Sequence, residues 1–503
     1  MKEVNLFNYT DIAVNIKDWK VDCFSADNKY PQDERKAIEE KYWAITEITD
    51  KFNRQSVSFQ LSKKDRMQRW LKYKEGFSAE LVRTLIKDFN VTPGQTILDP
   101  FMGSGTTALV SCMDGMNSVG FDILPMSKVA INAKMSVFEY DLKELETVFQ
   151  EVKKIKVPSN FVKETPYLTI TKEGYPLKTA IEIEYFTEYF AGSKHSDNVK
   201  NLIKLCILNC LEPVSYSIKA GQYLKWDTRC PRIQRVNQKR ISEGKAPLTS
   251  KNNKQIISGF REELIKELSN VISDIKIIQQ KNISDLHGRC KFFEDSALLG
   301  MPKMEANSIN AVISSPPYCN RYDYTRTYAM ELAYLGVDDN RLKELRQELL
   351  SCTVESKTKL DMLRNYYNEI GRIDDYNKIV EVINNNRTLT EIISALEKRN
   401  QNGEINNKGV LRMVKGYFTE LTFIFAEIYR VCTPGSYVGF VNDNVRYAGE
   451  VIPVDFLTTQ LAEQLGFKPI KIYTLMQKKG NSSQQMAKYG KVSLRKSITI
   501  WQK

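Results

Sequence analysis

Histidine and paired cysteine are scarce in this sequence, and each shortage excludes a kind of site. Two of the 503 residues are histidine, and the nine cysteines form no Cys-x-x-Cys pair. Zinc sites and disulfide frameworks need such residues, so we expect neither, and we expect the cysteines to be reduced thiols. No apolar run approaches the roughly 20 residues of a membrane-spanning helix. The chain opens on a polar segment instead of a signal peptide, which favours a cytoplasmic protein.

Positive charge exceeds negative charge in this chain. Lysine and arginine number 73, against 61 aspartates and glutamates, which gives a net charge of +12. A basic balance in a large chain favours a polyanionic partner such as nucleic acid. Net charge alone does not distinguish a nucleic-acid-binding protein from an ordinary basic enzyme. Sequence motifs are needed for that distinction.

Strand-like and helix-like segments alternate along the chain from about residue 66. The stretch QTILDPFMGSGTTALVSCMDG is typical of a strand, a glycine turn and a helix, and NSVGFDI and MSKVAINAKMSVF are typical of a second strand and helix. This alternation predicts an α/β fold with a doubly wound, mostly parallel sheet. The final segment, SLRKSITIWQK, is expected to be a strand antiparallel to its neighbour.

The alternation is interrupted twice, which predicts two mainly helical insertions into one α/β core. We therefore expect six segments, namely an N-terminal extension (1–65), the first half of the core (66–140), a first insertion (141–288), the strand ends of the core that carry catalysis (289–336), a second helical insertion (337–409) and the C-terminal half of the core (410–503).

The glycine turn has the features of a cofactor site. Asp99 ends the first strand, and Gly103 and Gly105 precede a helix, so a ligand can approach the backbone closely. A phosphate-binding P-loop is excluded because no Gly-Lys-Ser/Thr follows, and the glycine spacing differs from a dinucleotide fingerprint. The carboxylate of Asp99 suits a cationic amine, and Asp122, at the next strand end, suits ribose hydroxyls. An amine, a carboxylate and a ribose together describe S-adenosylmethionine.

Two motifs in this chain together resemble those of the amino-methylating DNA methyltransferases, which modify exocyclic amines of adenine or cytosine. DPFMGSGTT is similar to the cofactor loop of that family, and SPPY, at Ser315 to Tyr318, is similar to its catalytic motif. The resemblance covers about 66–140 and 290–503. It implies S-adenosylmethionine as cofactor and double-stranded DNA as substrate. In the family, Asp-Pro-Pro-Tyr usually accompanies adenine N6 and Ser-Pro-Pro-Tyr cytosine N4, so the resemblance implies N4-cytosine methylation.

The resemblance also implies a set of cofactor-binding residues. Phe77, in EGFSAELV, matches a phenylalanine that packs on the cofactor, and Asp295, in FEDSALL, matches an acid that faces its adenine. The expected cofactor-binding residues are Phe77, Asp99, Pro100, Phe101, Gly103, Gly105, Thr106, Thr107, Asp122 and Asp295.

The catalytic motif suits methyl transfer to a poor nucleophile. The lone pair of an exocyclic amine is delocalised into the base, so catalysis needs in-line placement and acceptors for its N–H groups. Ser315 Oγ and the carbonyl of Pro316 are the expected acceptors, Pro317 stiffens the turn, and Tyr318 is expected to stack on a flipped base. Methylation of cytosine carbon 5 needs a cysteine nucleophile, which follows a proline in the enzymes of that family. The chain contains no Pro-Cys dipeptide, which argues against this reaction.

A basic stretch with interleaved aromatic residues lies in the first insertion, between residues 216 and 245. Basic and aromatic residues together suit phosphate contact and stacking, although a solvated basic loop would have the same composition. Two further arginines follow the catalytic motif. We expect them either to contact DNA or to pair with neighbouring acids at the start of a helix. The expected DNA-binding residues are Lys219, Lys225, Trp226, Arg229, Arg232, Arg235, Arg321 and Arg326. We favour the first insertion as the target-recognition region, while the second is a candidate clamp or dimer contact.

Three other functions stay open at this point. The first is N6-adenine DNA methylation, since the correspondence between serine and cytosine is imperfect. The second is RNA base methylation, which the serine disfavours, and the third is a non-catalytic DNA-binding subunit, which would be expected to carry degraded motifs. A cognate restriction endonuclease is a candidate partner, because the chain shows no nuclease domain of its own.

Overall fold

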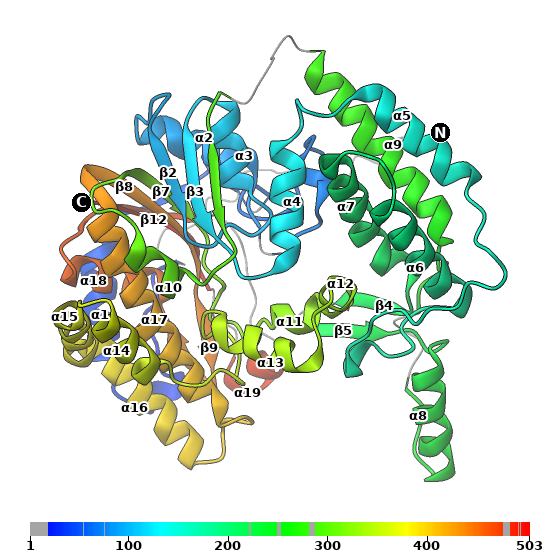
Figure 1. The fold of residues 1–503 in the computed structure, drawn as a ribbon. Helices are drawn as coiled ribbons and strands as arrows, with labels where there is room; N and C mark the ends of the chain where they lie inside the picture. Colours follow the sequence, from blue (N-terminus) through cyan, green and yellow to red (C-terminus); the bar gives the residue numbers. More distant parts are fainter. Residues whose placement is uncertain are drawn as a thin grey trace, which may run out of the picture.

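One mixed sheet forms the centre of the molecule (Figure 1). The structure is a computed structural model that describes residues 19–53, 55–74, 76–220, 223–248, 253–280, 287–475, 483–490, 492 and 494–503. In that part of the chain the central sheet has eight strands, in the order β1-β11-β12-β8-β7-β2-β3-β6. Its strands are β1 Thr46–Thr49, β2 Thr96–Asp99, β3 Asn117–Phe121, β6 Cys290–Phe293, β7 Ile309–Ser314, β8 Cys432–Asp443, β11 Lys468–Leu475 and β12 Lys496–Gln502.

The sheet is mostly parallel, which confirms the predicted α/β fold. β2 pairs in parallel with β3 on one side and with β7 on the other, so that Leu98 lies beside both Val119 and Val312. The final strand, β12, is antiparallel to β8 and β11, as predicted. The chain runs from β2 through a helix to β3, while β7 lies on the opposite side of β2. Such a reversal of strand order opens a crevice at the carboxyl ends of the strands.

Helices cover both faces of the sheet, and the strand residues alternate between them. Ile97 and Ile313 pack in one cluster with Leu85 of α2 (Ala79–Asp88). Leu98 and Val312 pack in another with α17 (Gly409–Val431) and α18 (Val454–Gln464). A strand that alternates in this way buries both of its faces, as is typical of parallel sheets. Helices α3 (Thr106–Met113) and α4 (Pro125–Met135) follow β2 and β3.

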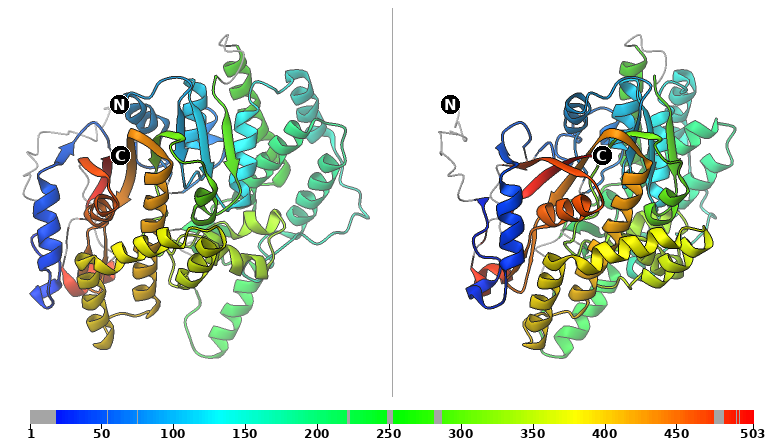
Figure 2. Two further views of the ribbon diagram at one scale, coloured as in Figure 1. Left: turned by 60° about the vertical axis from the view of Figure 1, so that its left-hand side comes forward. Right: turned by 90° about the vertical axis from the view of Figure 1, so that its left-hand side faces the viewer.

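The first insertion forms a helical body beside α4 and a projecting arm (Figures 1 and 2). The helices α5, α6, α7 and α9 share one apolar cluster with α4. The basic stretch is an antiparallel hairpin followed by α8, which reaches away from the body. The elements are α5 Leu142–Lys154, α6 Leu177–Ala191, α7 Asp197–Val214, β4 Ser217–Ala220, β5 Tyr223–Trp226, α8 Pro231–Ser242 and α9 Phe260–Gln279. Among the described residues, each helix is too short or too polar to cross a membrane.

The second insertion and the N-terminal segment pack against the other half of the sheet. Helices α14, α15 and α16 lie against α17, and α1 (Asp33–Trp43) lies against α16 and α18. The N-terminal segment also adds the edge strand β1, which pairs in parallel with β11. Arg495 of the last strand region, fully buried, binds both Glu39 of α1 and Asp455 of α18. The remaining elements are α10 Ala297–Gly300, α11 Tyr324–Thr327, α12 Ala329–Tyr334, α13 Asp339–Glu348, α14 Leu360–Glu369, α15 Ile373–Asn385, α16 Arg387–Gln401, β9 Val445–Tyr447, β10 Glu450–Ile452 and α19 Ser483–Tyr489.

Candidate active site

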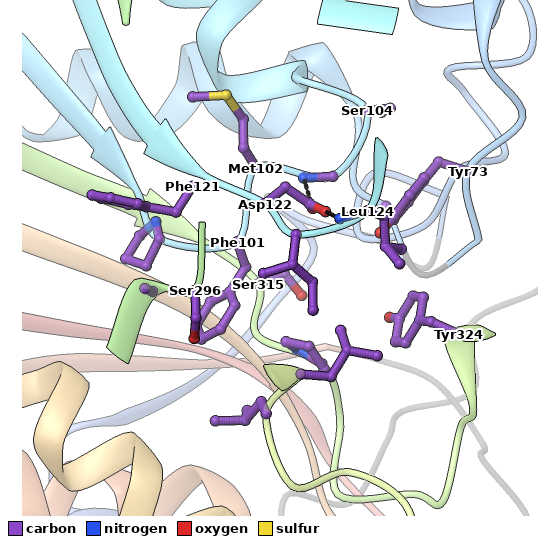
Figure 3. A pocket seen from close by; sticks show the side chains of 18 of the residues that line it. Tyr73, Phe101, Met102, Ser104, Phe121, Asp122, Leu124, Ser296, Ser315 and Tyr324 are labelled. Carbon is purple, nitrogen blue, oxygen red and sulfur yellow. Dashed lines mark hydrogen bonds between the residues drawn. The ribbon is translucent and has the colours of Figure 1, made fainter. Parts of the chain in front are cut away.

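A pocket lies at the carboxyl ends of β2, β3, β6 and β7, where the strand order reverses (Figure 3). It encloses about 740 Å³ of space between atoms, including its open mouth. The glycine loop forms one wall, and the Ser-Pro-Pro-Tyr turn contributes to another. Nine of the residues predicted from the sequence line it, namely Phe77, Pro100, Phe101, Gly103, Thr106, Asp122, Asp295, Ser315 and Pro317.

The glycine loop is held close to its neighbours, which explains why glycine is needed there. Gly103 and Gly105 have φ of 51° and 77°, a left-handed conformation that side chains disfavour. A Cβ on Gly105 would lie 2.7 Å from Ile131 on α4, and a Cβ on Gly103 would lie 3.0 Å from the ring of Tyr73. A side chain at either position would therefore displace the loop from α4 or from the tyrosine that walls the pocket.

Asp122 ties the glycine loop to the end of β3. Its carboxylate accepts hydrogen bonds from the backbone N–H of Gly103 and of Leu124, each at 2.8 Å (Figure 3). Burial raises the pKa of this carboxyl to about 6. A carboxylate has four lone-pair positions, so acceptor capacity remains for a hydroxyl donor in the pocket beside these two bonds and the neighbouring hydroxyl of Ser127. Asp122 thus positions the loop and still presents acceptor capacity to a ligand.

Asp99 lies behind the loop and does not line the pocket. Its carboxylate, 1% exposed, accepts the hydroxyl of Ser314 at 2.5 Å and the N–H of Phe101 at 3.0 Å. Burial raises its pKa to about 6. Thr107, also behind the loop, donates to the carbonyl of Ile313 at 3.2 Å. The bonds of Asp99 with Ser314 and of Thr107 with Ile313 tie the end of β2 and the start of α3 to the end of β7. The contact of Asp99 with a cationic amine stays a prediction.

The Ser-Pro-Pro-Tyr turn follows β7 and places Ser315 and Pro317 in the pocket wall. The hydroxyl of Ser315 donates to the hydroxyl of Tyr318 at 3.0 Å. Tyr318 is only 2% exposed, and the ammonium of Lys496 lies 4.8 Å from its ring centre. The stacking role predicted for Tyr318 therefore requires its ring to be uncovered when a base enters.

A tyrosine stack beside the pocket was not predicted from the sequence. The ring of Tyr73 stacks on Tyr328 at 5.5 Å and on Tyr324 at 6.1 Å, and Tyr73 and Tyr324 line the pocket. Residues 348–350, at the end of α13 in the second insertion, line it as well. The aromatic run YDYTRTY after the catalytic motif was the available signal for the stack.

Two of the predicted DNA-binding residues are engaged in ion pairs near the pocket. The ammonium of Lys219 pairs with Glu331, and the side chains of both are less than 10% exposed. Lys219 is thus held in a buried ion pair in this structure, and the phosphate contact expected of it stays a prediction. Arg326 pairs with Glu355 at 2.7 Å and with Asp323 at 3.2 Å, as in the alternative interpretation of this helix start.

The remaining predicted DNA-binding residues lie on the surface. In the hairpin and at the start of α8, Arg229 pairs with Asp227 at 2.6 Å and Arg235 pairs with Glu173. Arg232 donates to a main-chain carbonyl and lies over the ring of Trp226. The six residues of this set, each exposed or half-buried, are Lys225, Trp226, Arg229, Arg232, Arg235 and Arg321.

A glycine loop and a Ser-Pro-Pro-Tyr turn that share one pocket on this sheet define a methyltransferase of the α/β class. Residues 2–131 match a family model described as DNA methylase. The chain is 51% identical to the type II methyltransferase M.BsoBI of Geobacillus stearothermophilus, over 98% of this chain and 96% of that protein. It is 35% identical to the type II methyltransferase M.AvaI of a Nostoc species and of Anabaena variabilis, over 93% of each chain. The chain therefore belongs to the amino-methylating DNA methyltransferases, the family that acts on N4 of cytosine or N6 of adenine.

Proposed function

We propose that this protein transfers a methyl group from S-adenosylmethionine to the N4 amine of cytosine at a specific site in double-stranded DNA. The observation that carries the proposal is one pocket that is lined by both the glycine loop and the Ser-Pro-Pro-Tyr turn. A cofactor in the loop and a base at Ser315 would meet in this pocket without any rearrangement of the sheet.

The pocket residues fit S-adenosylmethionine. Phe77 and Phe101 supply apolar walls, and Asp122 has acceptor capacity left for ribose hydroxyls. Asp295, after the end of β6, lines the pocket and would contact the adenine. Asp99 lies behind the loop, so it would reach the amine of the ligand only if the loop shifted. The α3 amino terminus, behind Gly105, adds a favourable field for the carboxylate of the ligand. When bound, the cofactor supplies an electrophilic methyl group on sulfur.

The Ser-Pro-Pro-Tyr turn would prepare the amine as a nucleophile. The hydroxyl of Ser315 donates to Tyr318, so its lone pairs remain available to accept an N–H of the amine. The carbonyl of Pro316 is the second acceptor, and both draw the nitrogen lone pair out of the ring. With the cofactor bound, the amine nitrogen would form its bond to the methyl carbon as the bond of that carbon to sulfur breaks, and the methylated amine would then lose one proton to solvent. The base reaches this site only after it has been flipped out of the duplex.

The choice of cytosine depends on residue 315. The chain carries serine where the adenine-modifying members of the family usually carry aspartate. The relatives are named type II methyltransferases, and we extend that role to this chain. It would then protect the target site of a cognate restriction endonuclease, with the first insertion (141–288) as target-recognition region.

Methyl transfer to DNA and RNA separates the proposal from its alternatives. The purified protein is incubated with methyl-labelled S-adenosylmethionine and either unmethylated duplex DNA of varied sequence or transfer RNA. We expect label in DNA only, and no label with the Tyr318→Ala variant. Label in RNA would move the protein to RNA methylation, and no label in either would favour a non-catalytic DNA-binding subunit.

A further inference from the structure

Helix α8 stands apart from the rest of the molecule. Figures 1 and 2 show it projecting from the first insertion beyond the β4–β5 hairpin. Within α8, which the structure describes in full, only Ile233 is buried. Val236 and Ile241 are 40% and 61% exposed. A helix of a globular protein normally buries an apolar face, so an exposed helix of this kind indicates a surface that meets a partner.

The charge of α8 has one sign. Its twelve residues include four basic side chains and no acid, namely Arg232, Arg235, Lys239 and Arg240. The helix is fixed at its start, where Arg232 donates to the carbonyl of Ile170 at 2.8 Å and stacks over Trp226. Its far end extends from this anchor. A fixed, positively charged helix is complementary to a polyanion.

One side of α8 is covered by the segment that follows it. Arg240 donates to the carbonyl of Ala246 at 2.8 Å, and the side-chain oxygen of Asn237 accepts the N–H of Leu248 at 2.8 Å. At about 100° per residue, the positions opposite to this side form a second face. That face is exposed along its length and carries Arg235, Gln238, Lys239 and Ser242, with Gln234, also exposed, at its edge beside Gln238.

We propose that α8 enters the major groove of the DNA substrate and reads the target sequence through Gln234 and Gln238. These two residues are one turn apart, so their amides can address successive base edges, each with a donor and an acceptor. Arg235 and Lys239 run beside them. Their exposed ion pairs with Glu173 and Glu243 would be exchanged for contacts with phosphates. A helix with its side chains is about 10–12 Å across, which fits a major groove about 12 Å wide. This inference rests on the proposed DNA methylation.

The position of α8 is consistent with this role. Helix α10 follows β6 and marks one end of the sheet. In the view of Figure 1, α8 lies below that end. The pocket opens at that same end, at the carboxyl ends of the strands. A duplex that delivers a flipped base to the pocket would thus extend toward α8.

A double variant, Gln234→Ala with Gln238→Ala, tests the proposal through sequence discrimination. The measurement is kcat/KM on a duplex with the target site and on duplexes with single base-pair changes, together with the affinity for S-adenosylmethionine. A bidentate base contact is worth a factor of about 5 to 150, so we expect kcat/KM on the target to fall at least about 10-fold. Activity on the altered duplexes should change much less, and cofactor affinity should stay within about twofold. Alanine is the strongest helix former, so the variant is expected to fold.

Two further variants separate reading from electrostatic attraction. Arg235→Ala with Lys239→Ala should weaken binding to all duplexes alike and reduce the slope of log K against log salt by about 2. Gln150→Ala, on the exposed side of α5, is the matched glutamine control and should behave as wild type. Unchanged discrimination in the Gln234/Gln238 variant overturns the reading role of α8 while leaving DNA methylation intact. A wild-type protein that methylates no DNA would overturn the proposed function and this inference together.

Discussion

Replacing Asp122 with asparagine is expected to weaken binding of S-adenosylmethionine by one to two orders of magnitude. The carboxylate accepts the N–H groups of Gly103 and Leu124, each at 2.8 Å. Asparagine has one side-chain acceptor, so one of these N–H groups would face an amide NH₂ and lose its partner. A hydrogen bond to a charged group is worth about 1.5–3 kcal/mol, which corresponds to about 10- to 150-fold in Kd. Any bond to the ribose would add to this loss.

Isothermal titration of the purified protein with S-adenosylmethionine measures this effect. The control is Asp114→Asn, a surface aspartate paired with Arg83 outside the active-site pocket, which should bind as wild type. Because the pKa of Asp122 is about 6, wild-type affinity should fall as the pH drops through 6 and approach that of the variant. An Asp122→Asn protein that binds within twofold of wild type at pH 8 would refute the role assigned to this carboxylate.

Three other changes test separate parts of the structure. Ser315→Ala should lower kcat at least about 100-fold, the usual cost of one lost stabilising group at a reacting centre, with cofactor affinity nearly unchanged; equal losses in both would make Ser315 a cofactor ligand. Lys134 is fully buried, and burial lowers the pKa of its ammonium group to about 7. Between pH 7 and 10.5 the unfolded chain therefore holds a proton that the folded protein has lost, so the free energy of unfolding should rise with pH in that window. Lys134→Met should remove up to about 1.4 kcal/mol per pH unit of that slope in urea denaturation, and an unchanged slope would show the lysine to be charged. Arg495→Met leaves two buried carboxylates without their cation and should cost about 3–5 kcal/mol, whereas a loss below about 1 kcal/mol would show that they are protonated or hydrated.

The parts of the fold that depend on local signals could be predicted from the sequence. The strand, glycine turn and helix around Gly103 are encoded within about twenty consecutive residues. The antiparallel final strand could also be anticipated. The edge strand β1 could not, because its pairing of Thr46 with Ile472 joins segments more than 400 residues apart. Nothing in the composition of either segment specifies that register.

The same division holds for the site. The predicted loop and turn residues meet in one pocket because both motifs end neighbouring parallel strands. The stack of Tyr73 on Tyr328 and the pair of Lys219 with Glu331 depend on contacts between distant segments, so a basic residue could not be distinguished from a buried ion-pair partner in advance. The outer face of α8 is local, but its exposure is a tertiary property that helical periodicity alone does not reveal.

The identity of the methylated nucleoside is the most direct test of the proposed reaction. The protein would be incubated with unmethylated duplex DNA and methyl-labelled S-adenosylmethionine, and the DNA digested to nucleosides for chromatography and mass spectrometry. Chromatographic standards are needed because N4-methyldeoxycytidine and 5-methyldeoxycytidine have the same mass. N4-methyldeoxycytidine is the expected product, formed by wild type and formed at least about 100-fold more slowly by Ser315→Ala. N6-methyldeoxyadenosine would keep the methyltransferase and contradict the assignment of cytosine to the serine at residue 315.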